Sequence, residues 1–144
     1  MEEKNARIYF CGSIRGGRER QALYARMIAL LKEYGTVLTE HVGDPALTEK
    51  GGDGGSRYIY ERDMAWLREC DIVIAECSSP SLGVGYELAM AETLGKPSHI
   101  FYGGEPGRLS AMLEGSPHFT VYEYGSEETL MAELRRVMES GRHA

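Results

Sequence analysis

Short apolar runs alternate with stretches of helical periodicity along the chain. Each run is four to six residues long and has the composition of a buried strand. The predicted strands cover residues 7–12, 36–39, 71–76, 98–102 and 119–122. Between them, apolar positions recur three and four residues apart, which indicates helices that pack by one face. The predicted helices cover residues 19–34, 56–69, 86–94, 109–113 and 127–139.

Local signals mark several of the predicted helix ends. Gly35 and Gly95 follow apolar helical patterns, where a glycine commonly ends a helix. Ser56 precedes another such pattern, so we expect its hydroxyl to cap that helix. Residues 42–55, directly before Ser56, are rich in glycine and acidic residues and are predicted to form a loop.

The alternation of strands and helices indicates an α/β fold. We predict a single doubly wound domain over residues 1–144, flavodoxin-like or Rossmann-like, with a five-stranded, mostly parallel sheet. The expected strand order is 2-1-3-4-5. In such folds ligands bind at the carboxyl ends of the strands, near the switch between strands one and three. The turns after these two strands are therefore the first places to look for a site.

The turn after the first strand, residues 12–18, is rich in glycine and arginine. It leads into a helix, so its backbone N–H groups can point at an anion. Arg15 adds a planar charged group suited to phosphate. The sequence is neither a Walker A loop nor a dinucleotide fingerprint. Phosphate binding and a plain strand-to-helix turn both remain open.

The turn after the third strand leads to an acidic residue. Gly83 and Gly85 allow a backbone to approach a ligand closely, and Ser81 offers a hydroxyl. We expect Glu87 in the first turn of the following helix, where the helix dipole favours the ionised carboxylate. The alternative is an exposed glutamate that only complements this dipole.

Asp63 shares a predicted helix face with apolar side chains such as Ile59 and Trp66. An acid on such a face is paired, capping or functional. An ion pair with Arg62 or Arg68 is the weaker alternative, because neighbours in sequence point away from each other on a helix. One carboxylate kept ionised and a second kept protonated is what a glycosidase with two carboxylates requires.

Three further polar residues follow or lie in the predicted strands. Tyr9, in the first strand, can orient a carboxylate through its phenol or can be a core tyrosine. His41 can touch a base or lie on the surface, and Glu76 at the end of the third strand has the same two possibilities. The sequence leaves these alternatives open.

Composition and charge limit the class of ligand and indicate the cellular compartment. The net charge of -6 argues against a broad surface for a nucleic-acid polymer. The three cysteines lack the spacing of a disulfide framework or a zinc site, so we expect reduced thiols in a cytoplasmic protein. The first residues lack a signal-peptide pattern, and no apolar run has the length of a membrane span.

Longer stretches of the chain bear a family resemblance. Residues 9–18, 38–42 and 80–88, with 109–112, resemble the 2′-deoxynucleoside 5′-phosphate N-hydrolases of the nucleoside 2-deoxyribosyltransferase superfamily. The resemblance runs from about residue 7 into the last helix. It implies a doubly wound α/β homodimer that hydrolyses the N-glycosidic bond of 2′-deoxynucleoside 5′-monophosphates. It implies neither a metal nor an organic cofactor.

The resemblance also assigns roles to residues of this sequence. Glu87 is implied as the nucleophile that attacks C1′ and forms a deoxyribosyl intermediate, which water then hydrolyses to 2-deoxyribose 5-phosphate. Asp63 is implied to assist proton transfer to the leaving base, and Tyr9 to orient the nucleophile. Ser110 is implied to reach the phosphate of the neighbouring subunit. The other residues implied at the phosphate are Gly12, Ile14, Arg15, Gly16, Ser81 and Gly83.

Two other functions remain as alternatives. A nucleoside 2-deoxyribosyltransferase would use the same intermediate to exchange bases, but it binds a free 5′-hydroxyl rather than the phosphate that Arg15, Ser81 and Ser110 favour. A non-catalytic nucleotide-binding domain would bind without turnover. The base preference, for a purine nucleotide such as dGMP or for 5-hydroxymethyl-dUMP, stays open.

Overall fold

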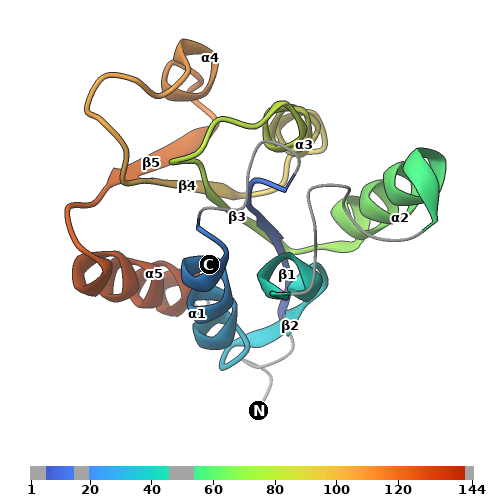
Figure 1. The fold of residues 1–144 in the computed structure, drawn as a ribbon, viewed down its shortest axis with the longest axis horizontal. Helices are drawn as coiled ribbons and strands as arrows, with labels where there is room; N and C mark the ends of the chain where they lie inside the picture. The colour runs from blue at the N-terminus through green and yellow to red at the C-terminus, as the bar shows by residue number, and fades with distance from the viewer. Residues whose placement is uncertain (1–5, 15–19, 46–53, 142–144) are drawn as a thin grey trace.

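A five-stranded parallel sheet forms the centre of the structure (Figure 1). The computed structural model describes residues 6–14, 20–45 and 54–141. The strands are β1 (Ala6–Cys11), β2 (Gly35–Val37), β3 (Ile72–Glu76), β4 (Ser98–Tyr102) and β5 (Phe119–Glu123). Their order, β2-β1-β3-β4-β5, confirms the prediction, and every pairing is parallel.

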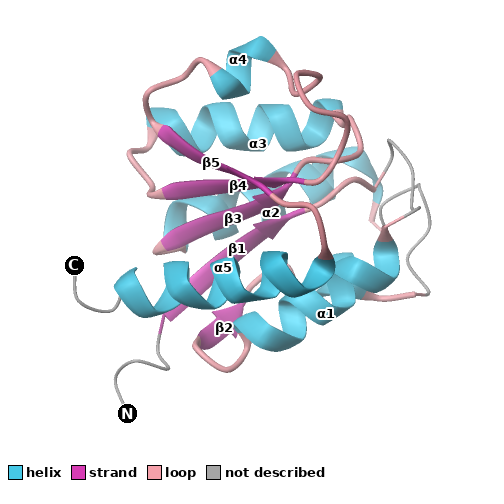
Figure 2. Cartoon of the chain, turned by 90° about the vertical axis from the view of Figure 1, so that its left-hand side faces the viewer, coloured by secondary structure: helices cyan, strands magenta, loops and turns pink. Residues whose placement is uncertain are grey.

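Helices cover both faces of this sheet. They are α1 (Gln21–Leu31), the 3₁₀ helix η2 (Glu40–Gly43), α2 (Gly55–Glu69), α3 (Leu82–Thr93), α4 (Ala111–Glu114) and α5 (Glu127–Gly141). Figure 2 shows α1 and α5 in front of the sheet and α2 and α3 behind it. None of the helices in the described part of the chain is long and apolar enough to span a membrane.

Alternating side chains of β1 contribute to two different apolar cores. Ile8 and Phe10 belong to the core beneath α1 and α5. Tyr9 and Cys11 belong to the core beneath α2 and α3. Because successive strand residues point to opposite faces, Tyr9 and Cys11 are directed towards the same helical layer. Both are 1% exposed, so their positions are fixed by packing.

The carboxyl ends of β1 and β3 lie side by side, because Cys11 pairs with Ala75. Thr39 secures the end of β1 with its hydroxyl, which accepts from Phe10 N at 2.9 Å and donates to Phe10 O at 2.8 Å. Gly12 then allows the ring of Tyr24 to pack closely, since an added Cβ would lie 2.8 Å from Tyr24 Cε2. The Tyr24 hydroxyl in turn accepts from Ser13 N at 3.0 Å. These contacts hold the turn after β1 at the sheet edge.

Two of the helix starts that differ from the prediction belong to helices that line the cavity. The α2 helix begins at Gly55 after Gly54 with φ 103°, so Ser56 lies inside the helix and does not cap it. The α3 helix begins at Leu82, four residues earlier than predicted, and the hydroxyl of Ser81 accepts from Val84 N at 3.2 Å. Gly83 and Gly85 are therefore helical, and Glu87 lies beyond the first turn of α3.

Candidate active site

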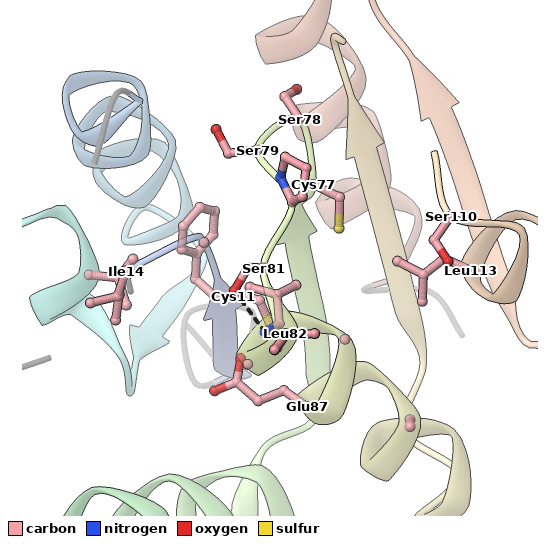
Figure 3. A pocket seen from close by; sticks show the side chains of 18 of the residues that line it. Cys11, Ile14, Cys77, Ser78, Ser79, Ser81, Leu82, Glu87, Ser110 and Leu113 are labelled. Atoms are coloured by element: carbon pink, nitrogen blue, oxygen red, sulfur yellow. Dashed lines mark hydrogen bonds between the residues drawn. The ribbon is translucent and has the colours of Figure 1, made fainter. Parts of the chain in front are cut away.

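A cavity of about 1180 Å³ opens at the carboxyl ends of β1 and β3 (Figure 3). Tyr9 is not part of its lining but reaches Glu87 from the strand beneath. Arg15 and Gly16 lie outside the described residues. The other site residues proposed from the sequence all line the cavity: Gly12, Ile14, Asp63, Ser81, Gly83, Glu87 and Ser110.

The most direct contact between two of these residues joins Tyr9 and Glu87. The Tyr9 hydroxyl donates to Glu87 Oε2 at 2.6 Å, across 78 positions of sequence. Burial and the nearby Glu87 charge raise the pKa of Tyr9, which keeps the phenol protonated as a donor. A strand in the sheet thus fixes the orientation of a carboxylate on α3.

The surroundings of Glu87 raise its pKa to about 7, chiefly through burial. The Tyr9 hydrogen bond opposes this shift, the charge of Asp63 adds to it, and Cys11 and Arg62 oppose it. The expectation that a helix dipole would favour the ionised form is therefore wrong for Glu87. It lies beyond the first turn, where the dipole is strongest, and desolvation outweighs the remaining effects.

Cys11 is a second donor that the sequence analysis missed. Its thiol lies close enough to Glu87 to favour the ionised carboxylate, and burial raises the thiol pKa well above its usual value. It is therefore a neutral donor rather than a thiolate. The available signal was its spacing from Tyr9, since residues two apart on a strand face the same side.

Asp63 is paired with its neighbour in sequence. Arg62 Nε lies 2.9 Å from Asp63 Oδ1, and both side chains are 19% exposed. The expectation that these neighbours in sequence would not pair is therefore wrong, whereas a catalytic role of Asp63 stays a prediction. Adjacent Cβ atoms do diverge on a helix, but the long arginine side chain folds back far enough to reach the carboxylate. Asp63 still lines the cavity with Glu87.

Arg62 lies at the centre of a polar and aromatic cluster. Its Nη2 lies 3.2 Å from His41 Nε2, and its Cζ lies 4.9 Å from the ring centre of Trp66 and 5.6 Å from that of Tyr58. Arg62 and His41 both line the cavity, and contact of His41 with a base stays a prediction. The sequence signal for this cluster was the four-residue spacing of Tyr58, Arg62 and Trp66 on one helix.

The N-terminus of α3 borders the cavity at Ser81 and Gly83. Backbone N–H groups at such a terminus attract an anion, and the turn at Gly12 and Ile14 lines the same space. Figure 3 shows Ser110 well apart from Ile14, Ser81 and Glu87. Within one chain the structure thus does not bring Ser110 to the other residues predicted for the phosphate.

Glu76 belongs to a buried network rather than to the cavity lining. It is 0% exposed, and its carboxylate accepts from the Tyr124 hydroxyl at 2.6 Å and from Ser78 N at 3.2 Å. The Ser78 hydroxyl also donates to Glu76 and accepts from Gly103 N at 2.8 Å. This network fixes the segment between β3 and α3, so Glu76 supports the site from outside.

These groups define a class of chemistry. Two carboxylates, one held by a phenol and a thiol, border a cavity that a helix N-terminus also enters. This arrangement suits a glycosidase acting on an anionic sugar. Among the residues that the structure describes, no group of three or more His, Cys, Asp or Glu side chains is placed to hold a metal ion.

Comparison with known proteins identifies the family. The family described as nucleoside 2-deoxyribosyltransferase matches residues 8–116. A 5-hydroxymethyl-dUMP N-hydrolase of Mus musculus is 54% identical over 127 residues, 84% of this chain and 73% of the relative. A Homo sapiens protein of the same name is 46% identical over 132 residues, 86% of this chain and 76% of the relative. The chain belongs to the nucleoside 2-deoxyribosyltransferase family.

Solved structures share the fold at low sequence identity. A CMP N-glycosidase of Clostridium botulinum has a TM-score of 0.62 at 16% identity, covering 90% of this chain and 98% of that one. A 2-deoxyribosyltransferase of Bacillus psychrosaccharolyticus has a TM-score of 0.61 at 18% identity, covering 90% and 96%. Both structural similarities show only that the fold is shared.

Removal of the Tyr9 hydroxyl should raise the pKa of Glu87 above about 7, because its hydrogen bond favours the ionised carboxylate. Carbon-13 NMR titration of labelled Glu87 in wild type and Tyr9→Phe measures this shift directly. Tyr34→Phe, distant from the cavity, is the matched control and should leave the Glu87 midpoint in place. A midpoint that stays put or moves down in Tyr9→Phe would contradict the assigned contact.

Proposed function

We propose that this chain hydrolyses the N-glycosidic bond of 2′-deoxynucleoside 5′-monophosphates, giving a free base and 2-deoxyribose 5-phosphate. Relatives about half identical to it carry the name 5-hydroxymethyl-dUMP N-hydrolase, which makes that nucleotide the first substrate to test. The observation that carries the proposal is the 2.6 Å hydrogen bond from Tyr9 to Glu87 at the cavity wall.

In the proposed first step, Glu87 is the nucleophile. Its carboxylate attacks C1′ and forms a C–O bond, while the C1′–N electron pair leaves with the base. Tyr9 and Cys11 orient the carboxylate and favour its ionised form against the burial that raises its pKa to about 7. Positive charge that develops at C1′ is stabilised by the carboxylate itself. Asp63, on the same cavity, assists proton transfer to the base.

In the second step, water attacks C1′ and displaces the Glu87 carboxylate. The hydroxyl of this water becomes the anomeric hydroxyl of 2-deoxyribose 5-phosphate. The other proton of the water is available to the departed base. The same carboxylate thus acts as nucleophile and then as leaving group, as in retaining glycosidases. No step calls for a metal ion or an organic cofactor.

The substrate phosphate is proposed to lie at the N-terminus of α3. Ser81 and Gly83 border that end of the cavity, with Gly12 and Ile14 opposite. Arg15 and Gly16 complete the proposed phosphate site from the turn after β1, outside the described residues. A site for the 5′-phosphate favours the hydrolase over a transferase that uses free nucleosides.

We propose a homodimer in which Ser110 completes the phosphate site of the partner. Ser110 is exposed and lies apart from Ser81 and Ile14 within one chain. Leu82 and Met112, which also line the cavity, are 97% and 81% exposed, as apolar side chains covered by a partner would be in the isolated chain. A partner that covers them would also bring its Ser110 to the site. The free cysteines Cys11, Cys70 and Cys77 support a reducing, cytoplasmic location.

Glu87→Ala should lower hydrolysis of 5-hydroxymethyl-dUMP and dGMP by at least about 10³-fold, because no nucleophile remains to receive C1′. Chromatography of the released base, with GMP and deoxyguanosine as further substrates, tests both the residue and the selectivity. Glu128→Ala on α5, across the sheet, is the matched control and should keep full activity. Substantial activity in Glu87→Ala would remove Glu87 as the nucleophile, and base exchange on deoxyguanosine would favour a transferase.

Ser110→Ala should raise KM for a deoxynucleotide about 10-fold with little change in kcat, because one hydrogen bond to a charged group is lost. Sedimentation should give a dimer for this variant and for the wild type. Met112→Asp should yield a monomer whose KM is raised at least as much. A wild type that sediments as a monomer and hydrolyses the substrate would refute the shared site.

A further inference from the structure

The half-buried cation of the cavity is Arg62. Among the described residues that line the cavity, the arginines are Arg62 and Arg108. The Arg108 side chain is 72% exposed and pairs loosely with Glu105, whereas the Arg62 side chain is 19% exposed and lies beside the two carboxylates. A positive charge in these partly desolvated surroundings acts on a bound ligand more strongly than one in water.

The guanidinium of Arg62 is held in place on several sides. Asp63 binds Nε at 2.9 Å, and the rings of Tyr58 and Trp66 lie within 5.6 Å of Cζ. An arginine has only donors, so His41 Nε2 is the acceptor in its 3.2 Å contact with Nη2. A guanidinium has five N–H donors, so it can bind a ligand carbonyl without giving up either contact. Arg62 is therefore preorganised as a donor and a charge.

The proposed reaction creates negative charge that such a group can stabilise. When the C1′–N1 bond of a pyrimidine nucleotide breaks, its electron pair leaves with the base. The resulting charge spreads over N1 and the carbonyl oxygens O2 and O4. A fixed cation beside the departing base lowers the energy of that transition state, because its position does not have to change during the reaction.

We propose that Arg62 binds a carbonyl oxygen of the departing base and stabilises its negative charge, with Asp63 and His41 holding the guanidinium in position. This inference rests on the proposed function and names a residue that selects bases with a carbonyl group. Arg62 also lies close enough to Glu87 for its charge to favour the ionised form of that carboxylate and lower its pKa. The base leaves as an anion held by Arg62, and it then takes, through Asp63, the proton that the attacking water releases, so the step balances without another reactant.

A purely indirect role makes a different prediction. If Arg62 only orients or pairs Asp63, its removal has no effect once Asp63 can no longer exchange a proton. If Arg62 acts on the base itself, its removal slows the reaction in either background. A double-mutant cycle between the two residues separates these cases.

The experiment measures single-turnover cleavage of dUMP and its 5-hydroxymethyl and 5-fluoro derivatives, whose bases form a series of increasingly good leaving groups. Arg62→Gln should slow cleavage of dUMP about 100-fold, with a smaller loss for the 5-fluoro compound. Arg62→Lys, which keeps the charge, should recover part of the rate. Arg62→Gln in an Asp63→Asn background should still cost about 10-fold or more. Arg68→Gln, on the exposed side of α2, is the matched control and should behave as wild type.

Four outcomes would overturn the inference. Equal losses on all three nucleotides would point to a general structural effect, which thermal unfolding of Arg62→Gln would register as well. No further loss in the Asp63→Asn background would assign Arg62 to Asp63 alone. Wild-type protein that cleaves none of the nucleotides would refute the proposed function together with this inference, whereas an active wild type matched by Arg62→Gln would refute the inference alone.

Discussion

The hydrogen bond between Tyr9 and Glu87 is the contact on which the site depends. It joins β1 to α3 within the core beneath α2 and α3. It depends on the register of β1 and β3, which places Tyr9 beside Val73. The same alternation along β1 directs Cys11 to the carboxylate. A one-residue shift of β1 would turn both donors to the opposite face of the sheet. The fold therefore positions the carboxylate through strand register more than through the local sequence around Glu87.

The electrostatics of the cavity follow from this placement. Burial raises the pKa of Glu87 to about 7, whereas the Tyr9 phenol, the Cys11 thiol and the Arg62 guanidinium counteract that shift. A buried carboxylate with a pKa near 7 is less strongly solvated than one on the surface, and fixed donors stabilise its charge. Arg62 links this centre to Asp63 and His41, so the proposed base end and the proposed nucleophile share one charged network.

The sequence predicted the fold and its strand order because the apolar runs are short, distinct and separated by helical periodicity. It misplaced the start of α3, since Gly83 and Gly85 are typical of a turn, whereas the Ser81 cap allows the helix to include them. The site residues came from motif resemblance, which identifies residue types but not their contacts. The Arg62–Asp63 pair was ranked as the weaker alternative because Cβ directions alone do not account for the length of an arginine side chain.

The central claim, that Glu87 forms a covalent bond to the deoxyribose, can be tested by mass spectrometry of the enzyme during turnover. The enzyme is incubated with a 2′-fluoro-2′-deoxynucleotide that carries a good leaving base, and the mixture is then quenched with acid and digested with a protease. The fluorine slows breakdown of the intermediate enough for it to be detected. We expect the peptide that contains Glu87 to gain one fluorinated deoxyribose 5-phosphate, and Glu87→Gln to give no such peptide. Release of the base with this peptide unmodified, or with the sugar attached to another residue, would contradict it.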